Sequence, residues 1–210
     1  MNVYVIGDSI SVHYGPYLEK ALVGVAAYTR KGGPDAAGTD WENPAEANGG
    51  DSNLVRTFLS ANLPLIAADT LLLNCGLHDL RVDRSTGAHQ VDLAAYERNL
   101  IAIIALIQAH QIKPVWITTT PLIDAVHNRH DLPYRRFRRD VVTYNQVAAE
   151  VMRTQEVPVI DLFGFMVELG PDIYLDHVHL KPEIRQQQAA FIAAELRTLT
   201  TPKSGANGLT

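Results

Sequence analysis

A serine near the amino terminus and an aspartate and histidine near the carboxyl terminus are the side chains that a serine hydrolase needs. Gly7-Asp8-Ser9 directly follows a short apolar run, and Asp176-His177-Val178-His179 lies near the other end of the chain. A serine hydroxyl becomes an effective nucleophile when a histidine takes its proton and a carboxylate orients that histidine. On a turn, the spacing of Asp176 and His179 lets the carboxylate meet one imidazole nitrogen while the other nitrogen faces a hydroxyl. These residues predict nucleophilic catalysis through Ser9.

Each of these residues also has another interpretation. Asp8 or Ser9 would serve as the N-cap of a helix, a position that favours both residue types. Asp176 would serve as a turn residue, and His179 as a partly buried ring. A further alternative is a metal site made by Asp176, His177 and His179, although no second cluster with ligand spacing accompanies them. From the residues alone, these alternatives stay open beside the catalytic one.

Short apolar runs rich in β-branched residues alternate with helical patterns along the chain. The runs are continuous instead of alternating with polar residues, as is typical of strands buried on both faces of a sheet. Helices are predicted over Asp92–His110, Val141–Thr154 and Lys181–Leu199. This alternation indicates βαβ units and a parallel sheet. The predicted strands are Val3–Ile6, Val23–Tyr28, Thr70–Asn74, Pro114–Thr119 and Val157–Ile160.

Three polar loops follow predicted strands and hold residues of interest. Residues 7–9 follow the first strand, residues 76–79 the third and residues 118–121 the fourth. In open parallel α/β sheets the ligand lies at the carboxyl ends of the strands, so we expect the three loops to line one rim. The segment Thr29–Asp51, rich in Gly, Pro, Asn and Asp, is expected to be irregular and to border that rim.

Length and composition suit one domain. The chain has 210 residues, 47% of them hydrophobic, and we expect one domain over residues 1–199 and a disordered tail over residues 200–210. A net charge of −5 and a pI of about 5.9 give no general attraction to nucleic acid, so no nucleic-acid partner is expected. Cys75 is the only cysteine, which excludes an intramolecular disulfide, and it ends the apolar run Leu71–Cys75, which is expected to be buried.

The apolar runs are too short to cross a membrane. The longest candidate, Leu100–Ile107, falls well short of the roughly 18 residues of a membrane-spanning helix. Predicted strand residues begin close to Met1, without the basic region, apolar segment and cleavage site of a secretion signal. We therefore expect a soluble protein with no membrane partner, cytoplasmic unless a signal has been removed from the chain.

Four blocks of the chain resemble the SGNH hydrolases, also called the GDSL esterase and lipase family. Gly7-Asp8-Ser9-Ile10 resembles the first block, which holds the nucleophile, and Asp176-His177-Val178-His179 resembles the last, whose Asp and His complete the triad. Gly49-Gly50-Asp51-Ser52 falls where the second block places an oxyanion glycine, and its second glycine is favoured over its first. Gly76-Leu77-His78-Asp79 matches the third block, usually Gly-x-Asn-Asp. The resemblance spans nearly the whole chain.

His78 stands where the family has asparagine. The family's asparagine donates an N–H to the oxyanion that forms during catalysis, and donors of this kind can contribute about 10²–10³ in rate. A neutral histidine also donates one N–H, although its reach and tautomer differ. The string Gly76–Leu80 resembles a subset of the family that carries GLHDL, in which this histidine is a subtype feature. The resemblance thus implies an oxyanion hole made by Ser9, Gly50 and His78.

The resemblance implies a three-layer α/β/α sandwich with a parallel five-stranded sheet, a flavodoxin-like arrangement. It also implies ester hydrolysis through an acyl-enzyme by Ser9, Asp176 and His179, without a metal or organic cofactor. We expect a small carboxylic ester, first of all an O-acetylated carbohydrate, because the loops are polar and no long apolar lid is evident. The alternatives are a thioesterase or lysophospholipase of the same family, and a catalytically weak carbohydrate-binding or regulatory protein on the same scaffold.

Three further residues are candidates for contact with substrate. Asp8 lies beside the nucleophile, Trp41 lies in the long loop where its ring can stack on a sugar, and Arg81 follows the third block. The structural alternatives are a helix cap for Asp8 and a solvated side chain for Arg81, while the ring of Trp41 could instead cover an acyl group. The arginine-rich run Tyr134–Arg139 is interpreted as a solvated helix start and not as a nucleic-acid patch.

Overall fold

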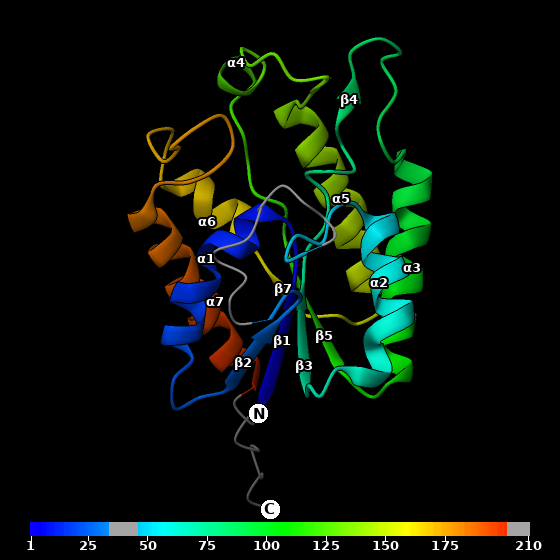
Figure 1. The fold of residues 1–210 in the computed structure, drawn as a ribbon, viewed down its shortest axis with the longest axis vertical. Coiled ribbons are helices and arrows are strands. Elements are labelled where there is room, and N and C mark those ends of the chain that lie inside the picture. The colour runs from blue at the N-terminus through cyan, green and yellow to red at the C-terminus, as the bar shows by residue number, and fades with distance from the viewer. Residues whose placement is uncertain (34–45, 201–210) are drawn as a thin grey trace, which may run out of the picture.

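The computed structural model describes residues 1–33 and 46–200, which form a three-layer α/β/α sandwich (Figure 1). Its central sheet has five parallel strands in the order β2-β1-β3-β5-β7. This sheet and the helices on both of its faces confirm the predicted fold class. The strands are β1 (Asn2–Ile6), β2 (Ala27–Arg30), β3 (Thr70–Leu73), β5 (Lys113–Ile117) and β7 (Val159–Ile160).

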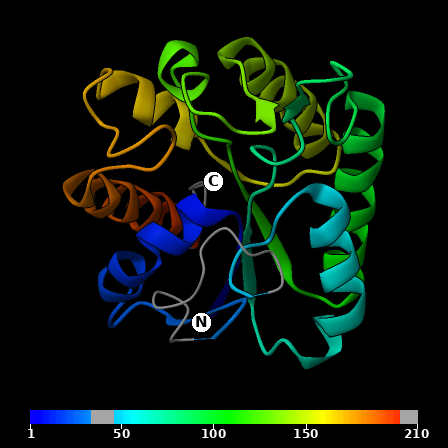
Figure 2. The ribbon, with the colours of Figure 1, turned by 45° about the horizontal axis from the view of Figure 1, so that its top comes forward.

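Two groups of helices cover the sheet, one on each face (Figures 1 and 2). On one face α1 (Ser9–Ala21) packs against α7 (Pro182–Thr200), which also contacts α6 (Leu162–Glu168). On the other face α3 (Leu93–Ala109) packs between two neighbouring helices. Those neighbours are α2 (Ser52–Asn62) and α5 (Arg138–Thr154). The remaining elements are short: η2 (Leu63–Leu65), α4 (Asp124–His127) and the antiparallel strands β4 (Val82–Asp83) and β6 (Tyr134–Arg135).

The core lies where the sheet meets its helices. All four residues of β3 are buried, and Trp116 of β5 has no exposed surface. α3 presents a stripe of buried residues at helical spacing, as its pattern predicts. Each large apolar side chain that becomes fully buried contributes about 1.5–3 kcal/mol of hydrophobic stabilisation. The buried residues of this stripe are Tyr96, Asn99, Leu100, Ile103, Ile104 and Ile107.

The second strand is the element that differs most from the prediction. Val23–Tyr28 is apolar, but the strand begins only at Ala27. Gly24 has a φ of 76°, and the N–H groups of Val25 and Ala26 both donate to the carbonyl of Leu22. These residues therefore form the turn that ends α1, and the prediction was wrong for the residues before Ala27.

The other element boundaries are closer to the predicted ones. Strand ends differ by one or two residues in most cases, and α5 begins three residues before the predicted Val141. α2 and α6 were not predicted. Within the described ranges, no helix combines the length and apolar character needed to cross a membrane.

The carboxyl ends of β1, β3 and β5 meet along one edge of the sheet, at the top of the view in Figure 1. The N–H of Asn74 donates to the carbonyl of Ile6, at 3.1 Å, where β1 and β3 end. The N–H of Gly49 donates to the carbonyl of Gly7, at 2.7 Å. The loops that follow β1 and β3 and the loop that precedes α2 are therefore neighbours. Residues 34–45 of the segment Thr29–Asp51, and the predicted tail after Thr200, lie outside the described residues.

Candidate active site

Ser9, His179 and Asp176 form a continuous line of hydrogen-bonded side chains. Ser9 is the first residue of α1, directly after the β1 loop. The Nε2 atom of His179 lies 3.0 Å from the hydroxyl oxygen of Ser9, and its Nδ1 atom lies 2.8 Å from Oδ2 of Asp176. Ser9 and His179 are buried, at 5% and 7% exposed, so water is largely kept from the hydrogen bond between them. A serine, a base and an orienting carboxylate in this order can perform nucleophilic acyl transfer.

Asp8 is the N-cap of α1 and directly precedes the nucleophile candidate Ser9. Its Oδ1 atom accepts the N–H of Ile10 at 3.0 Å, so the residue has the capping role considered from the sequence. Burial raises the pKa of Asp8, an effect opposed by the N–H of Ile10 and by the nearby charge of Arg136. The N–H of Ser9 has no acceptor within the helix, and it lies where the helix dipole favours negative charge. The start of α1 therefore suits a developing oxyanion.

Asp176 is held as a carboxylate. Its Oδ1 atom accepts the N–H groups of Val178 and His179 at 2.8 and 2.7 Å, and its Oδ2 atom faces the imidazole. Burial raises the pKa of Asp176, but these hydrogen bonds outweigh burial and lower the pKa to about 2. The ionised Asp176 therefore favours the tautomer of His179 that carries hydrogen on Nδ1, which leaves Nε2 able to take the proton of Ser9.

The two glycines of the second block have different hydrogen-bond partners. The N–H of Gly49 is committed to the backbone carbonyl of Gly7. The N–H of Gly50 donates to the side-chain oxygen of Asn48 at 2.8 Å, and Gly50 has a φ of 73°, which a residue with a side chain adopts at a cost. A side-chain partner can turn away more easily than a backbone partner. Gly50 is thus better suited than Gly49 to donate to an oxyanion.

The third block forms the turn after β3. His78 is buried there, at 3% exposed. The next residue, Asp79, accepts the N–H of Ser52 at 2.9 Å and so joins this turn to the start of α2, and burial raises its pKa to about 7. Gly76 has a φ of 152°, and a Cβ atom there would lie 2.3 Å from Oγ1 of Thr119. The turn therefore requires glycine at that position.

Arg136 corrects the interpretation of the run Tyr134–Arg139 as a solvated helix start. α5 begins at Arg138, and Arg136 precedes it and is only 3% exposed. Its Nε donates to the carbonyl of Leu77 at 2.6 Å, directly before His78. Arg136 therefore holds the third-block turn. The sequence does not predict this role, because nothing in the pattern of residues distinguishes Arg136 from the other three arginines of the run.

Further histidines surround the triad. The ring of His13, one helical turn after Ser9, lies 4.7 Å from the ring of His179. The Nδ1 atoms of His177 and His127 are 2.9 Å apart. Burial lowers the pKa of both, that of His127 to about 3, so the two neutral rings share one Nδ1 hydrogen. This hydrogen bond fastens the loop of Asp176 and His179 to α4. His127 was missed from the sequence, since nothing there links it to the triad.

The structure does not form the metal site considered from the sequence. Both ring nitrogens of His179 have partners, Ser9 and Asp176, and Nδ1 of His177 is bonded to His127. Among the residues that the structure describes, no group of three or more His, Cys, Asp or Glu side chains is placed to hold a metal ion. The residues at this edge fit the triad arrangement and not a ligand set.

Two candidates for substrate contact have described positions. Asp8 is 2% exposed and caps α1, so the structure supports its structural role, and a substrate contact stays a prediction. The guanidinium of Arg81 lies 4.3 Å over the ring of Tyr134, which fixes it near the third block, and its contact with substrate also stays a prediction. Trp41 lies outside the described residues.

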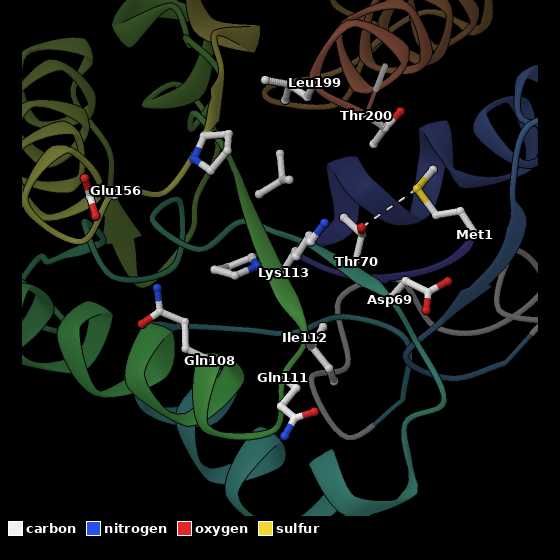
Figure 3. A pocket seen from close by; sticks show the side chains of 13 residues that line it. Met1, Asp69, Thr70, Gln108, Gln111, Ile112, Lys113, Glu156, Leu199 and Thr200 are labelled. Carbon is white, nitrogen blue, oxygen red and sulfur yellow. Dashed lines mark hydrogen bonds between the residues drawn. The ribbon is translucent and has the colours of Figure 1, made fainter. Parts of the chain in front are cut away.

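A cavity of about 790 Å³ lies at the opposite end of the sheet (Figure 3). Its lining includes Thr70 and Lys113, the first residues of β3 and β5. No triad residue is part of that lining. Because the strands are parallel, this end of the sheet is separated from Ser9 by the length of the strands. The candidate active site therefore lies at the other edge of the sheet, away from this cavity.

The sequence of residues 5–186 matches the model of the GDSL-like lipase/acylhydrolase family. A lipase/acylhydrolase from Enterococcus faecalis is similar in structure, with a TM-score of 0.72, 18% identity, and coverage of 97% of this chain and 99% of that one. An acetyl xylan esterase, AlAXEase, has a TM-score of 0.69, 16% identity, and coverage of 96% and 100%. A psychrotrophic esterase, EstA, from Pseudoalteromonas sp. has a TM-score of 0.66, 13% identity, and coverage of 94% and 97%. Among curated protein sequences, none is significantly similar to this chain.

Proposed function

The chain belongs to the GDSL-like lipase/acylhydrolase family and is an ester-hydrolysing serine hydrolase, and we propose that Ser9 cleaves small polar esters, first of all O-acetyl esters of carbohydrates. The observation that carries the catalytic part is the 3.0 Å contact between the Ser9 hydroxyl and Nε2 of His179, continued to Asp176.

In the proposed reaction, His179 takes the proton of Ser9 while the hydroxyl oxygen attacks the ester carbonyl. The carbonyl oxygen becomes an oxyanion, and the carbon–oxygen bond to the alcohol then breaks as His179 returns the proton to the leaving alcohol. Asp176 stabilises the imidazolium that exists between these steps. Water then attacks the acyl-enzyme, with His179 again as the base, and releases the acid and free Ser9.

We assign the oxyanion to three donors. They are the N–H of Ser9 at the start of α1, the N–H of Gly50 and the imidazole of His78. The N–H of Gly50 donates to the side-chain oxygen of Asn48 in this structure. To stabilise the oxyanion, this N–H must either donate to both oxygens or leave the Asn48 oxygen when substrate binds. Donors that are fixed in place act most strongly on charge that develops only in the transition state.

The surroundings of the triad support a polar substrate. The described neighbours of His179 include the imidazoles of His13 and His177, at ring distances of 4.7 and 6.2 Å. Arg81 and Arg136 lie on the third-block side of the site, 4.3 and 5.0 Å from the centre of the Tyr134 ring. Such groups suit hydroxyl and carbonyl oxygens better than a long acyl chain. One of the structural neighbours is itself named an acetyl xylan esterase, which agrees with an acetylated carbohydrate as the first substrate to test.

The substrate proposal is tested with a series of p-nitrophenyl esters and a set of acetylated saccharides. We expect kcat/KM to be highest for acetate and to fall as the acyl chain lengthens, and we expect acetylated saccharides to release acetate. The Ser9→Ala variant provides the background. A rate that rises steadily toward long acyl chains would favour a lipase or thioesterase, and saccharide binding without turnover would favour the carbohydrate-binding alternative.

The role of His78 gives a prediction of its own. Replacing His78 with alanine should lower kcat by about 10²-fold, while KM changes much less, because the lost N–H acts mainly on the transition state. His78→Asn should retain more activity than His78→Ala, since asparagine restores a side-chain donor. Steady-state kinetics on p-nitrophenyl acetate measure both. A His78→Ala enzyme with full kcat would remove this residue from the oxyanion hole.

A further inference from the structure

We infer that Arg30 and Lys31 are positioning residues of this esterase, which hold the loop of Gly50 against the nucleophile helix. The inference rests on the proposed function, because it concerns the geometry of the oxyanion hole. The two residues lie at the carboxyl end of β2, the strand that pairs with β1, and each is 5% exposed. Two adjacent buried cations are unusual in a protein interior, where charges need partners.

Arg30 bridges the helix of Ser9 and the loop of Gly50. Its Nη1 donates to the carbonyl of Ser11 at 2.7 Å, within the first turn of α1. Its Nη2 donates to the carbonyl of Ala47 at 3.2 Å, three residues before Gly50. The planar guanidinium fixes both directions at once. One side chain therefore sets the distance between the two segments that carry oxyanion donors.

Lys31 holds the same loop on either side of Ala47. Its ammonium donates to the carbonyl of Asn48 at 2.9 Å and to the carbonyl of Glu46. It also lies over the ring of Phe58 in α2, 5.2 Å from the ring centre. Three successive carbonyls, those of residues 46, 47 and 48, thus point at two neighbouring cations. Hydrogen bonds from charged donors are stronger than neutral ones, so this loop has little freedom to move.

A glycine in α1 leaves space for the side chain of Arg30. Gly15 lies in the middle of α1, where glycine is unfavourable compared with alanine. A Cβ atom at Gly15 would lie 2.8 Å from Nη1 of Arg30 and also 2.8 Å from the hydroxyl of Tyr28. The guanidinium occupies the space that any side chain at this position would need. Gly15 therefore lowers the helix propensity of α1 but leaves the space that the guanidinium of Arg30 occupies.

The loop also bonds directly to the nucleophile segment. The N–H of Gly49 donates to the carbonyl of Gly7, two residues before Ser9, and a Cβ atom at Gly49 would lie 3.2 Å from that same oxygen. Arg30 and Lys31 hold the residues just before this contact. Loss of either cation would let residues 46–50 shift relative to Ser9, and a shift of about 1 Å at a reacting centre can cost about 10²-fold in rate.

The test compares Lys31→Met with Lys113→Met, which removes an exposed lysine at the other end of the sheet. Active sites are titrated with a fluorophosphonate, so that kcat refers to the fraction of enzyme with a reactive Ser9. We expect Lys31→Met to lower kcat per titrated site by about 10- to 100-fold with KM within about threefold of wild type, and Lys113→Met to leave both unchanged. Lys31→Arg, which keeps the charge and donors, should recover part of the loss.

Gly15→Ala is the second variant, and it tests the positioning role of Arg30 even if Lys31→Met does not fold. Alanine favours the helix, so stability measured by thermal unfolding should not collapse, whereas displacement of Arg30 should lower kcat by about 10-fold. The inference is overturned if Lys31→Met or Gly15→Ala folds and keeps full kcat per titrated site. It is also overturned if activity falls only in proportion to titratable sites. A wild type that neither turns over esters nor is labelled at Ser9 would instead overturn the proposed function.

Discussion

Replacing Ser9 with alanine is expected to lower kcat for p-nitrophenyl acetate by about 10⁴- to 10⁶-fold. The hydroxyl oxygen of Ser9 forms the bond to the acyl group, and alanine leaves His179 without an atom to activate. Residual turnover above the uncatalysed rate would come from substrate binding and from the backbone N–H of residue 9, which alanine retains. Steady-state kinetics and labelling by a fluorophosphonate probe measure the effect, and the variant should not be labelled.

Ser60→Ala is the matched control for this substitution. Ser60 lies on the exposed face of α2, and its hydroxyl bonds only to the carbonyl of Arg56 among the described contacts. We expect this variant to have wild-type kcat and to be labelled normally. Thermal unfolding should show Ser9→Ala to be folded. Ester turnover by Ser9→Ala at the wild-type rate would mean that another residue is the nucleophile.

Replacing His179 with alanine is expected to lower kcat to a similar extent, about 10⁴- to 10⁶-fold. Without the imidazole, the Ser9 hydroxyl keeps its proton in the attack, and the leaving alcohol has no acid to protonate it. Because Ser9 and His179 act as a unit, the double variant Ser9→Ala/His179→Ala should be no less active than either single variant. Kinetics of the three variants on one ester measure this non-additivity.

His110→Ala serves as the control for the second substitution. His110 ends α3, is exposed, and its Nδ1 contacts only the carbonyl of Leu106 among the described residues. Its loss should leave kcat unchanged. If the effects of Ser9→Ala and His179→Ala multiplied in the double variant, the two residues would be acting in separate steps, and the hydrogen bond of 3.0 Å between them would not be the catalytic contact.

The hydrophobic patterns along the chain were sufficient to predict the fold class, because they reflect local helix and strand preferences that are retained in the tertiary structure. The buried run Thr70–Leu73 became β3, and the helical stripe of Asp92–His110 became α3, with its boundaries off by one residue at each end. Val23–Tyr28 shows where this reasoning fails. Its apolar residues are typical of a strand, but Gly24 and the hydrogen bonds to Leu22 make a turn of its first part, a choice that depends on how α1 must end.

The short blocks were sufficient to predict a triad of Ser9, Asp176 and His179, because acyl transfer requires side chains of those types and the family resemblance implies their order. They were not sufficient to describe how the site is held. Arg30, Lys31 and Arg136 contact backbone carbonyls of loops that are 15 to 59 residues away in the chain. A carbonyl acceptor has no sequence signature, so no pattern of residue types marks its partner.

Which side chains can do the chemistry was therefore decided by residue type and order, and how they are held was decided by packing. A carboxylate and a histidine three residues apart interact locally, and one turn is enough to bring Asp176 to His179. The meeting of His179 with Ser9 spans 170 residues and exists only because parallel strands bring their carboxyl ends to one edge. The partners of Gly50 and the neutral pair of His127 and His177 depend on burial, a property that arises only when the layers are assembled.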